Sequence, residues 1–286
     1  MNKNVGVIRS YDLGSHWVKF GRVCVYAACI CLTLIALFPA VWVLLAGFKS
    51  MSEFTRTPSL LPSSYNFSVF TETWKKFHFE KYYVYSLISV VGCVVCAVFF
   101  NALTAYALQI LKPIGSKVIN GLVMWSLMIP VTVGIVPLFI NVTNMGLKGS
   151  FLPIWLCMGA NAFYVVLFKQ FFRSFPASMV EAARLDGCSE LETFLKIVTP
   201  LSKSIVMVVV IYAINASWSD FLFPYLVLNQ SGRETVMVRL FQFRTSTVTD
   251  VDVLRAIVFA IIPPIILFLA CSKTITASVM EGGIKE

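Results

Sequence analysis

Residues 169–203 read KQFFRSFPASMVEAARLDGCSELETFLKIVTPLSK, and their chemistry differs from that of every stretch around them. Pro176 suits the first turn of a helix, because its missing N–H would be unpaired there in any residue. The residues from Ala177 to Asp186 are mostly good helix formers. Gly187 is expected to end this helix, since glycine accepts the left-handed backbone that a C-terminal cap requires.

A second helix is predicted directly after this glycine. Ser189 and Glu192 have the S-x-x-E spacing of a capping box, which places the start of the helix near Glu190. Pro200 disfavours helical backbone in the residue before it, so we expect the helix to stop before Pro200. The stretch therefore predicts two short helices around a glycine turn.

The predicted hairpin is both charged and apolar. Its charged side chains exclude it from the membrane interior: Glu181, Arg184, Asp186, Glu190, Glu192 and Lys196. Its apolar side chains recur at helical spacing: Met179, Val180, Ala183, Leu191, Phe194 and Leu195. Such a stripe has to be buried. Spacing alone favours burial against the inner ends of the chain's own membrane spans or in the headgroups, and docking into a cytoplasmic partner is the alternative.

The composition of the 286 residues places the rest of the chain in a membrane. Hydrophobic residues make up 58% of the chain and charged residues 13%, whereas a soluble domain has about 45–50% and about 25%. Too few charged side chains remain to cover a water-soluble surface. The excess of 23 Lys and Arg over 14 Asp and Glu indicates contact with anionic headgroups rather than with nucleic acid.

Six apolar runs have the length of about 20 residues that a transmembrane helix needs. They extend approximately from Val23 to Gly47, Tyr82 to Leu111, Val118 to Ile140, Ser150 to Phe168, Ser204 to Leu228 and Ala256 to Ser272. The fifth run contains one acid, Asp220, and the sixth is short and has Pro263 and Pro264 at its centre. The sequence thus predicts an all-α integral membrane protein with six spans.

An even number of spans puts both termini on the same side as the hairpin. That side carries 13 of the 23 Lys and Arg residues, a slight bias that favours it as cytoplasmic. The expected organisation is a cytoplasmic N-terminus over 1–22, a six-span domain over 23–272 that contains the loop 169–203, and a cytoplasmic tail over 273–286.

The hairpin also carries a spaced motif. Glu181-Ala182-Ala183 is followed after three residues by Gly187, and after nine more by Ile197, with Pro200 three further on. This pattern resembles the EAA loop of the membrane subunits of ATP-binding-cassette importers. Thr199 departs from it, because Leu is usual at that position.

The resemblance covers most of the chain and is closest to the carbohydrate, maltose-type class with a MetI-like transmembrane domain. The segments that carry it are FPAVWVLLAGFKS at 38–50, LPSSYNFSVFTETW at 61–74, MIPVTVGIVPLF at 128–139, WSDFLFP at 218–224 and GGIKE at 282–286. Ser219, Gln109 and Glu286 depart from the usual pattern and leave the class intact.

The resemblance implies the type I importer permease fold and a set of partners. These are a second permease subunit, a pair of ATP-binding subunits, an external solute-binding protein and the bilayer of a bacterial inner membrane. The chain itself has no G-x-x-x-x-G-K-[ST] phosphate loop, so no cofactor is expected on it. The coupling residues implied by the motif are Glu181, Ala182, Ala183, Asp186, Gly187 and Pro200.

Polar residues inside the apolar runs are candidates for the translocation path. Asp220 is the one acid in a run, and a carboxylate at membrane depth is a functional hypothesis by default. It can also anchor the helix end beside Trp218. Asn161 and Asn215, like Asn101, can bind hydroxyl-rich ligands or hold helices together, and residue type favours helix packing.

Three other functions remain as alternatives. An importer of a non-sugar solute would share the EAA loop. A secondary transporter or channel would predict inverted repeats or several intramembrane charges, and we find no repeat. A membrane enzyme is disfavoured because the two histidines, His16 and His78, and the scattered acids form no metal or nucleophilic site.

Overall fold

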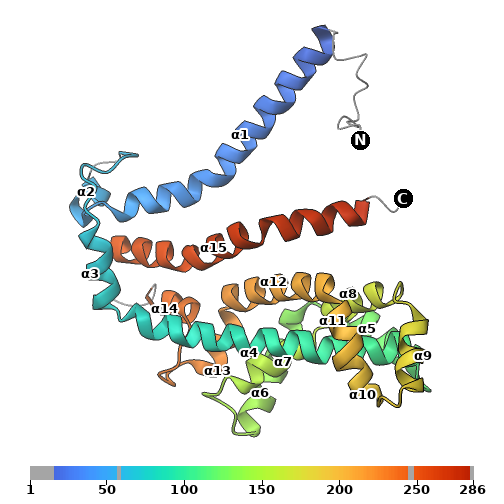
Figure 1. Cartoon of the computed structure of the whole chain (residues 1–286). Coiled ribbons are helices and arrows are strands. Elements are labelled where there is room, and N and C mark those ends of the chain that lie inside the picture. Colours follow the sequence, from blue (N-terminus) through green and yellow to red (C-terminus); the bar gives the residue numbers. More distant parts are fainter. Residues whose placement is uncertain (1–15, 57–58, 244–247, 284–286) are drawn as a thin grey trace. The chain divides into compact units, whose positions relative to one another are not determined.

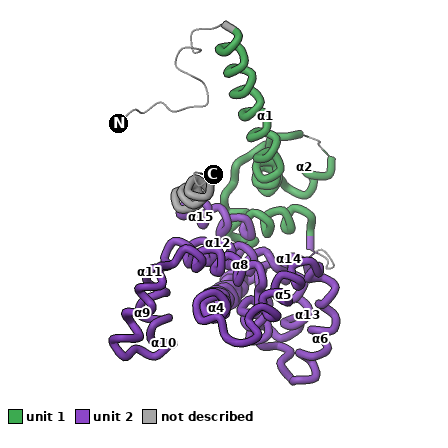
Figure 2. Tube along the Cα trace, turned by 90° about the vertical axis from the view of Figure 1, so that its right-hand side faces the viewer, with its two compact units in different colours: residues 1–73, 249–258 green, residues 74–248, 259–286 purple. Residues whose placement is uncertain are grey.

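The computed structural model describes residues 16–56, 59–243 and 248–283, and for residue 16 and residues 272–283 it describes the backbone alone. Every regular element in these ranges is helical (Figure 1). The chain divides into two compact units, which are coloured separately in Figure 2. The first comprises residues 1–73 and 249–258, and the second comprises residues 74–248 and 259–286.

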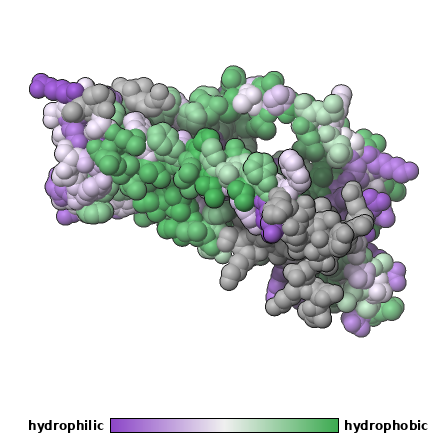
Figure 3. Space-filling model, turned by 90° about the horizontal axis from the view of Figure 1, so that it is seen from above, coloured by the Kyte–Doolittle hydropathy of each residue, from purple (hydrophilic) through white to green (hydrophobic). Residues whose placement is uncertain are grey.

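Four helices are long and apolar enough to cross a membrane: Trp17–Gly47, Phe79–Leu111, Leu152–Phe172 and Asp250–Cys271. Two further bent pairs of helices qualify together, which gives up to six spans. Many large apolar side chains are exposed on these helices, and Figure 3 shows broad hydrophobic areas on the face in view. Such a surface requires lipid or another apolar surface around it.

The first unit contains α1 (His16–Gly47), α2 (Met51–Arg56), most of α3 (Ser68–Lys76) and the start of α15 (Asp250–Gly283). Most side chains of α1 are exposed until its last turn. The small core of this unit forms around Phe48, whose ring meets the rings of Tyr65, Phe67 and Phe70 at centroid distances of 5.5, 5.0 and 4.9 Å.

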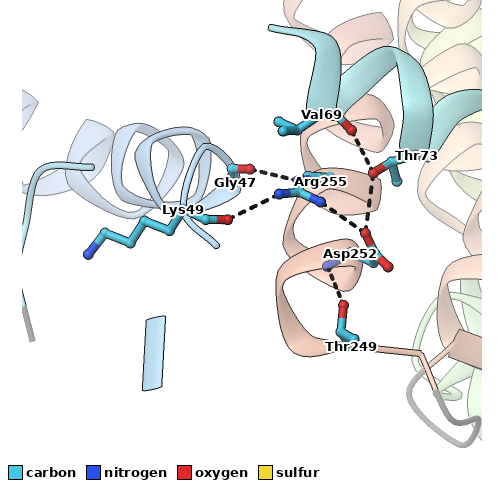
Figure 4. Close-up of polar contacts among 7 residues, drawn as sticks. All are labelled: Gly47, Lys49, Val69, Thr73, Thr249, Asp252 and Arg255. Carbon is cyan, nitrogen blue, oxygen red and sulfur yellow. Dashed lines mark hydrogen bonds and ion pairs between the residues drawn. The ribbon is translucent and has the colours of Figure 1, made fainter. Parts of the chain in front are cut away.

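A buried ion pair ties these elements together (Figure 4). The Arg255 guanidinium lies 3.0 Å from Asp252 Oδ1, and the two side chains are 13% and 8% exposed. Arg255 also donates to the carbonyl oxygens of Gly47 at 2.7 Å and Lys49 at 3.0 Å. Thr73 Oγ1 donates to Asp252 Oδ1 at 3.3 Å. Arg255 thereby caps the C-terminal end of α1, where carbonyl groups lack partners within the helix.

The second unit is built around α4 (Phe79–Tyr106), which continues as a π-helical turn, η2 (Ala107–Leu111). Three helices pack along α4: α7 (Leu152–Gly159), α8 (Ala162–Phe172) and α12 (Lys203–Ser219). Gly92 allows α7 to approach α4 closely, because a Cβ atom there would lie 2.2 Å from the Trp155 ring.

The third apolar run is not one straight helix. The structure divides that run into α5 (Ser116–Ser126), a 3₁₀ turn η3 (Val131–Gly134) and α6 (Ile135–Asn144), with a bend of 99° between its two halves. Pro130 lies at the break with an extended ψ of 129°. Proline removes a backbone donor and disfavours helical backbone before it, which explains why the helix ends there.

The fifth run is not one helix either. The helix α12 stops at Ser219, Asp220 has an extended backbone with ψ of 128°, and α13 (Leu222–Leu228) follows as a separate helix. A short helix α14 (Val236–Phe243) precedes the last one.

The last helix is longer than expected. Instead of the run from Ala256 to Ser272, α15 extends from Asp250 to Gly283 and continues through Pro263 and Pro264. The expected tail over 273–286 is therefore helical as far as Gly283. Residues 284–286 and most of the expected N-terminal segment, 1–15, lie outside the described residues.

Candidate functional site

The first helix of the predicted hairpin is α9 (Ala177–Leu185), with Pro176 as its N-cap residue. Gly187 follows with φ of +82°, the left-handed backbone that its residue type predicts. The N–H of Gly187 bonds the carbonyl of Arg184 at 3.1 Å, and the N–H of Cys188 bonds that of Ala183 at 3.0 Å. This pair of bonds is the Schellman arrangement that terminates helices, so the glycine turn is confirmed.

The second helix starts as expected with α10 (Glu190–Thr193). Ser189 and Glu192 form a complete capping box, because each side chain accepts a hydrogen bond from the backbone N–H of the other. Lys196 Nζ lies 2.9 Å from Glu192 Oε1. The bond from Lys196, followed by those from Ser189, lowers the pKa of Glu192 to about 2. Glu192 is therefore charged at neutral pH and stabilises the start of the helix.

The prediction that this helix stops before Pro200 is wrong. It passes through a π-helical turn, η4 (Phe194–Val198), into α11 (Thr199–Leu201), and bends by 85° into α12 only at Ser202. In the π turn the N–H of Thr199 reaches back to Phe194. Pro200 then occupies the first turn of α11, where a missing N–H breaks no bond.

The apolar stripe of the hairpin divides into two faces. Val180, Ala183 and Phe194 are only 2–3% exposed, and Val180 and Phe194 belong to the main core of the second unit. This confirms burial against the chain's own helices. Four other side chains stay 46–89% exposed: Met179, Leu185, Leu191 and Leu195. The hairpin therefore buries one set of apolar side chains in the core of the second unit and leaves these four uncovered; we call the four together the outer apolar face.

A hydrogen-bonded bridge joins the hairpin to α4, at whose C-terminal end it lies in Figure 1. Glu190 accepts a bond from Arg184 Nε and another from the Tyr106 hydroxyl, each at 2.8 Å. Both bonds, that of Arg184 first, hold the pKa of Glu190 below its ordinary value. Tyr106 is 1% exposed, and its ring packs against Phe194 at 5.4 Å. The bridge thus connects both helices of the hairpin to the last turn of α4.

The residues of the motif take different positions in this geometry. Glu181, Ala182, Asp186, Gly187 and Pro200 are exposed, whereas Ala183 is buried at 2% exposure. Sequence reasoning missed Tyr106. A tyrosine near the end of an apolar run carries no signal that its hydroxyl meets a carboxylate 84 residues later.

A second candidate site is a cavity of about 180 Å³ inside the second unit. Asn161, Ser217 and Asp220 supply its oxygen and nitrogen atoms, and the thiols of Cys93 and Cys157 also line it. The remaining lining side chains are apolar, and Val131, Ile135 and Leu138 contribute one wall from the broken third run. Two of the four path candidates, Asn161 and Asp220, are therefore brought together.

The other two path candidates lie apart from this cavity. Asn215 is exposed on α12. The Trp218 indole is 6% exposed and donates to the carbonyl of Ala260 at 3.0 Å, which fixes α12 against α15 within the second unit. Trp218 has the geometry of a packing residue.

Two asparagines stabilise the break between α7 and α8, which lies beside the cavity. Asn161 is the N-cap of α8, where its Oδ1 accepts from the N–H groups of Phe163 and Tyr164. Asn101 is fully buried on α4 and accepts from the N–H of Asn161 at 2.9 Å. Its Nδ2 donates to the carbonyl of Met158 at 3.0 Å. Asn101 thus holds helices together, as residue type favoured.

No group of three or more His, Cys, Asp or Glu that could hold a metal ion occurs among the described residues. His78 lies exposed beside Glu80 at 3.3 Å. The side chain of His16 is not among those described.

The family profile described as "Binding-protein-dependent transport system inner membrane component" matches residues 97–279, which include the hairpin and every residue that lines the cavity except Cys93. The chain belongs to this family. As its name states, such a component works in the membrane with a separate binding protein.

Individual proteins agree with this assignment. The chain is 28% identical to the diacetylchitobiose uptake system permease protein NgcG of Streptomyces coelicolor, over 90% of this chain and 87% of that protein. It is 30% identical to the arabinooligosaccharides transport system permease protein AraQ of Bacillus subtilis, over 89% and 92% of the two chains. A chain of a bacterial ABC transporter involved in alginate import has the same fold, with a TM-score of 0.77, 24% identity and coverage of 94% and 99%.

Proposed function

We propose that this chain forms half of the translocation pathway of an ATP-driven importer for a sugar or oligosaccharide. ATP is hydrolysed on separate subunits, and the chain itself performs no chemistry. The observation that carries this proposal is the two-faced hairpin, which is fixed in the chain's own core on one side and presents an uncovered apolar face on the other.

The sugar class rests on the relatives. NgcG is named for diacetylchitobiose uptake, and AraQ is named for the transport of arabinooligosaccharides. Both align with this chain over most of their length, so the sequence features that they share extend beyond the hairpin. An importer of a non-sugar solute is the alternative within the same family.

The hairpin is the contact to the ATP-binding subunit in this proposal. The exposed Glu181 offers a charged anchor, and the outer apolar face supplies the area that loses water on docking. Because Val180, Ala183 and Phe194 are buried with the chain's own helices, a push on the hairpin moves the spans with it. Closure of the ATP-binding pair would then switch the spans between inward-open and outward-open arrangements.

Location and remaining partners follow from this arrangement. The hairpin faces the cytoplasm, where ATP is, so both termini lie on that side of a bacterial inner membrane. A second permease subunit completes the pathway, and the solute-binding protein docks on the outer segments 48–81 and 229–255. Glu181, Ala182, Asp186, Gly187 and Pro200 form the exposed part of the coupling site, and Ala183 packs behind them.

Purification of the tagged chain from its native membranes in mild detergent tests the proposal. Mass spectrometry is expected to find a phosphate-loop ATPase and a second multi-span subunit. Leu185 is 89% exposed on the outer apolar face, and Leu60 is 53% exposed elsewhere. We expect Leu185→Ser to reduce recovery of the ATPase and Leu60→Ser, the matched control, to leave it unchanged. A chain that purifies alone and moves solute in vesicles without ATP would be a secondary carrier.

Loss of the hydrogen bond between Tyr106 and Glu190 is expected to weaken the coupling of transport to ATP hydrolysis. Tyr106→Phe keeps the ring against Phe194 and removes the bond to Glu190. That bond to a half-exposed carboxylate contributes about 1 kcal/mol, so sugar transported per ATP hydrolysed should fall roughly fivefold. Both rates are measured in proteoliposomes of the assembled transporter.

The matched control is Tyr212→Phe, which removes the same hydroxyl from a 51% exposed ring on α12. It should leave the ratio of transport to hydrolysis unchanged. If Tyr106→Phe also leaves the ratio of transport to ATP hydrolysis unchanged, the bridge does not contribute to coupling.

A further inference from the structure

We propose that the cavity beside Asp220 binds a single sugar ring during translocation and selects neutral and amino sugars against uronic acids. This inference rests on the proposed import function and concerns the charge of the substrate. It makes Asp220 a specificity-determining residue, a role beyond anchoring the end of α12.

The cavity has the size of one ring. Its volume is about 180 Å³, and an apolar cavity of about 150 Å³ accommodates one benzene molecule. Val131, Ile135, Ile154 and Phe223 among others supply apolar walls. The carbon-bound hydrogens of a sugar ring form apolar patches that can pack on such walls, and the hydroxyl groups at its edge require polar partners.

The cavity offers these polar partners. Ser217 is 8% exposed, and apart from the weakly bonding Cys93 thiol beside it, its Oγ has no hydrogen-bond partner among the described residues. A buried hydroxyl without a strong partner is unfavourable, and a ligand hydroxyl in the cavity would supply one. Asn161 uses Oδ1 to cap α8, which leaves Nδ2 as a donor. The Asp220 carboxylate adds acceptor oxygens, to which hydroxyl and ammonium groups donate strongly.

The formal charge on the lining of the cavity is of one sign, negative. Asp220 is the one carboxylic acid among the described residues that line it, and that lining contains no Lys or Arg. A carboxylate in an apolar enclosure acts on a neighbouring charge more strongly than it does in water. It therefore attracts the ammonium group of an amino sugar and repels the carboxylate of a uronic acid, while a neutral ring enters on its hydroxyl groups alone.

Thiol protection in the assembled transporter tests this inference. Cys157 lines the cavity and is partly exposed, so it reports occupancy when its alkylation is followed by peptide mass spectrometry. The probes are glucose, glucosamine and glucuronate, which have one ring each and differ in charge. We expect glucosamine to protect best and glucuronate worst, with half-maximal concentrations about tenfold apart.

Two substitutions isolate the charge. Asp220→Asn should make the three half-maximal concentrations converge, whereas Asp220→Glu should keep their order and guards against a variant that fails to assemble. Equal protection by the three sugars in the unchanged protein, no protection by any of them, or an order that survives Asp220→Asn would each overturn the inference. Recovery of the ATPase with the complex is scored separately, so failure here is distinguishable from failure of the importer assignment.

Discussion

Replacing Gly187 with valine should lower sugar uptake by at least about tenfold, since the left-handed backbone costs about 1–2 kcal/mol in an ordinary residue and more in a β-branched one. Gly187 has φ of +82°. A Cβ atom there would meet no other atom within 4 Å, so the effect comes from the backbone and not from a clash. The turn must open, which displaces α9 relative to α10 and moves the outer apolar face. Uptake is measured in cells, and ATPase recovery in the detergent purification should fall with it.

Gly115 provides a matched control for this prediction. It has φ of +88°, and a Cβ atom there would also meet no other atom within 4 Å, but it lies in the tight loop before α5. Gly115→Val introduces the same strain outside the hairpin and should leave most uptake intact. Gly187→Asn should also retain uptake, because asparagine tolerates this backbone. Equal uptake in Gly187→Val and Gly115→Val would remove the special role of the hairpin turn.

The hairpin was predictable because its signals are local. A glycine that needs a positive φ, and a serine three residues before a glutamate, specify their own conformations with little help from the rest of the fold. Gly187, Ser189 and Glu192 all have the expected geometry. Pro200 shows the limit of this reasoning, since a π turn upstream allows a proline that local rules place after the helix.

The breaks within the third and fifth runs could not be located from hydropathy, because hydropathy reports environment and not backbone continuity. The third and fifth runs are apolar throughout their breaks, apart from Asp220, and so read as whole helices. Those breaks help to form the cavity. Asn161 and Asp220 are 59 positions apart in the sequence, and no periodicity connects them. The two residues line the same cavity only because α7, α8 and α12 pack along α4.

The ion pair of the first unit was also invisible in the sequence, where Arg255 and Asp252 read as charges next to a membrane span. Arg255→Met should destabilise the protein by about 3–5 kcal/mol, because it removes the guanidinium that lies 3.0 Å from the buried carboxylate of Asp252. It also removes the donors to the carbonyls of Gly47 and Lys49. The expected result is a clearly lower unfolding temperature of the purified transporter in detergent.

Two further variants separate the pair from general effects of charge. Arg56→Met removes an exposed arginine at the end of α2 and should change stability little. The double variant with Arg255→Met and Asp252→Leu removes both buried charges, so it should be more stable than Arg255→Met alone. If the double variant is no more stable than the single one, the carbonyl bonds at the end of α1 carry the stabilisation and the carboxylate does not. The first span would then be held mainly by a helix cap, and Asp252 would serve to orient the arginine that provides it.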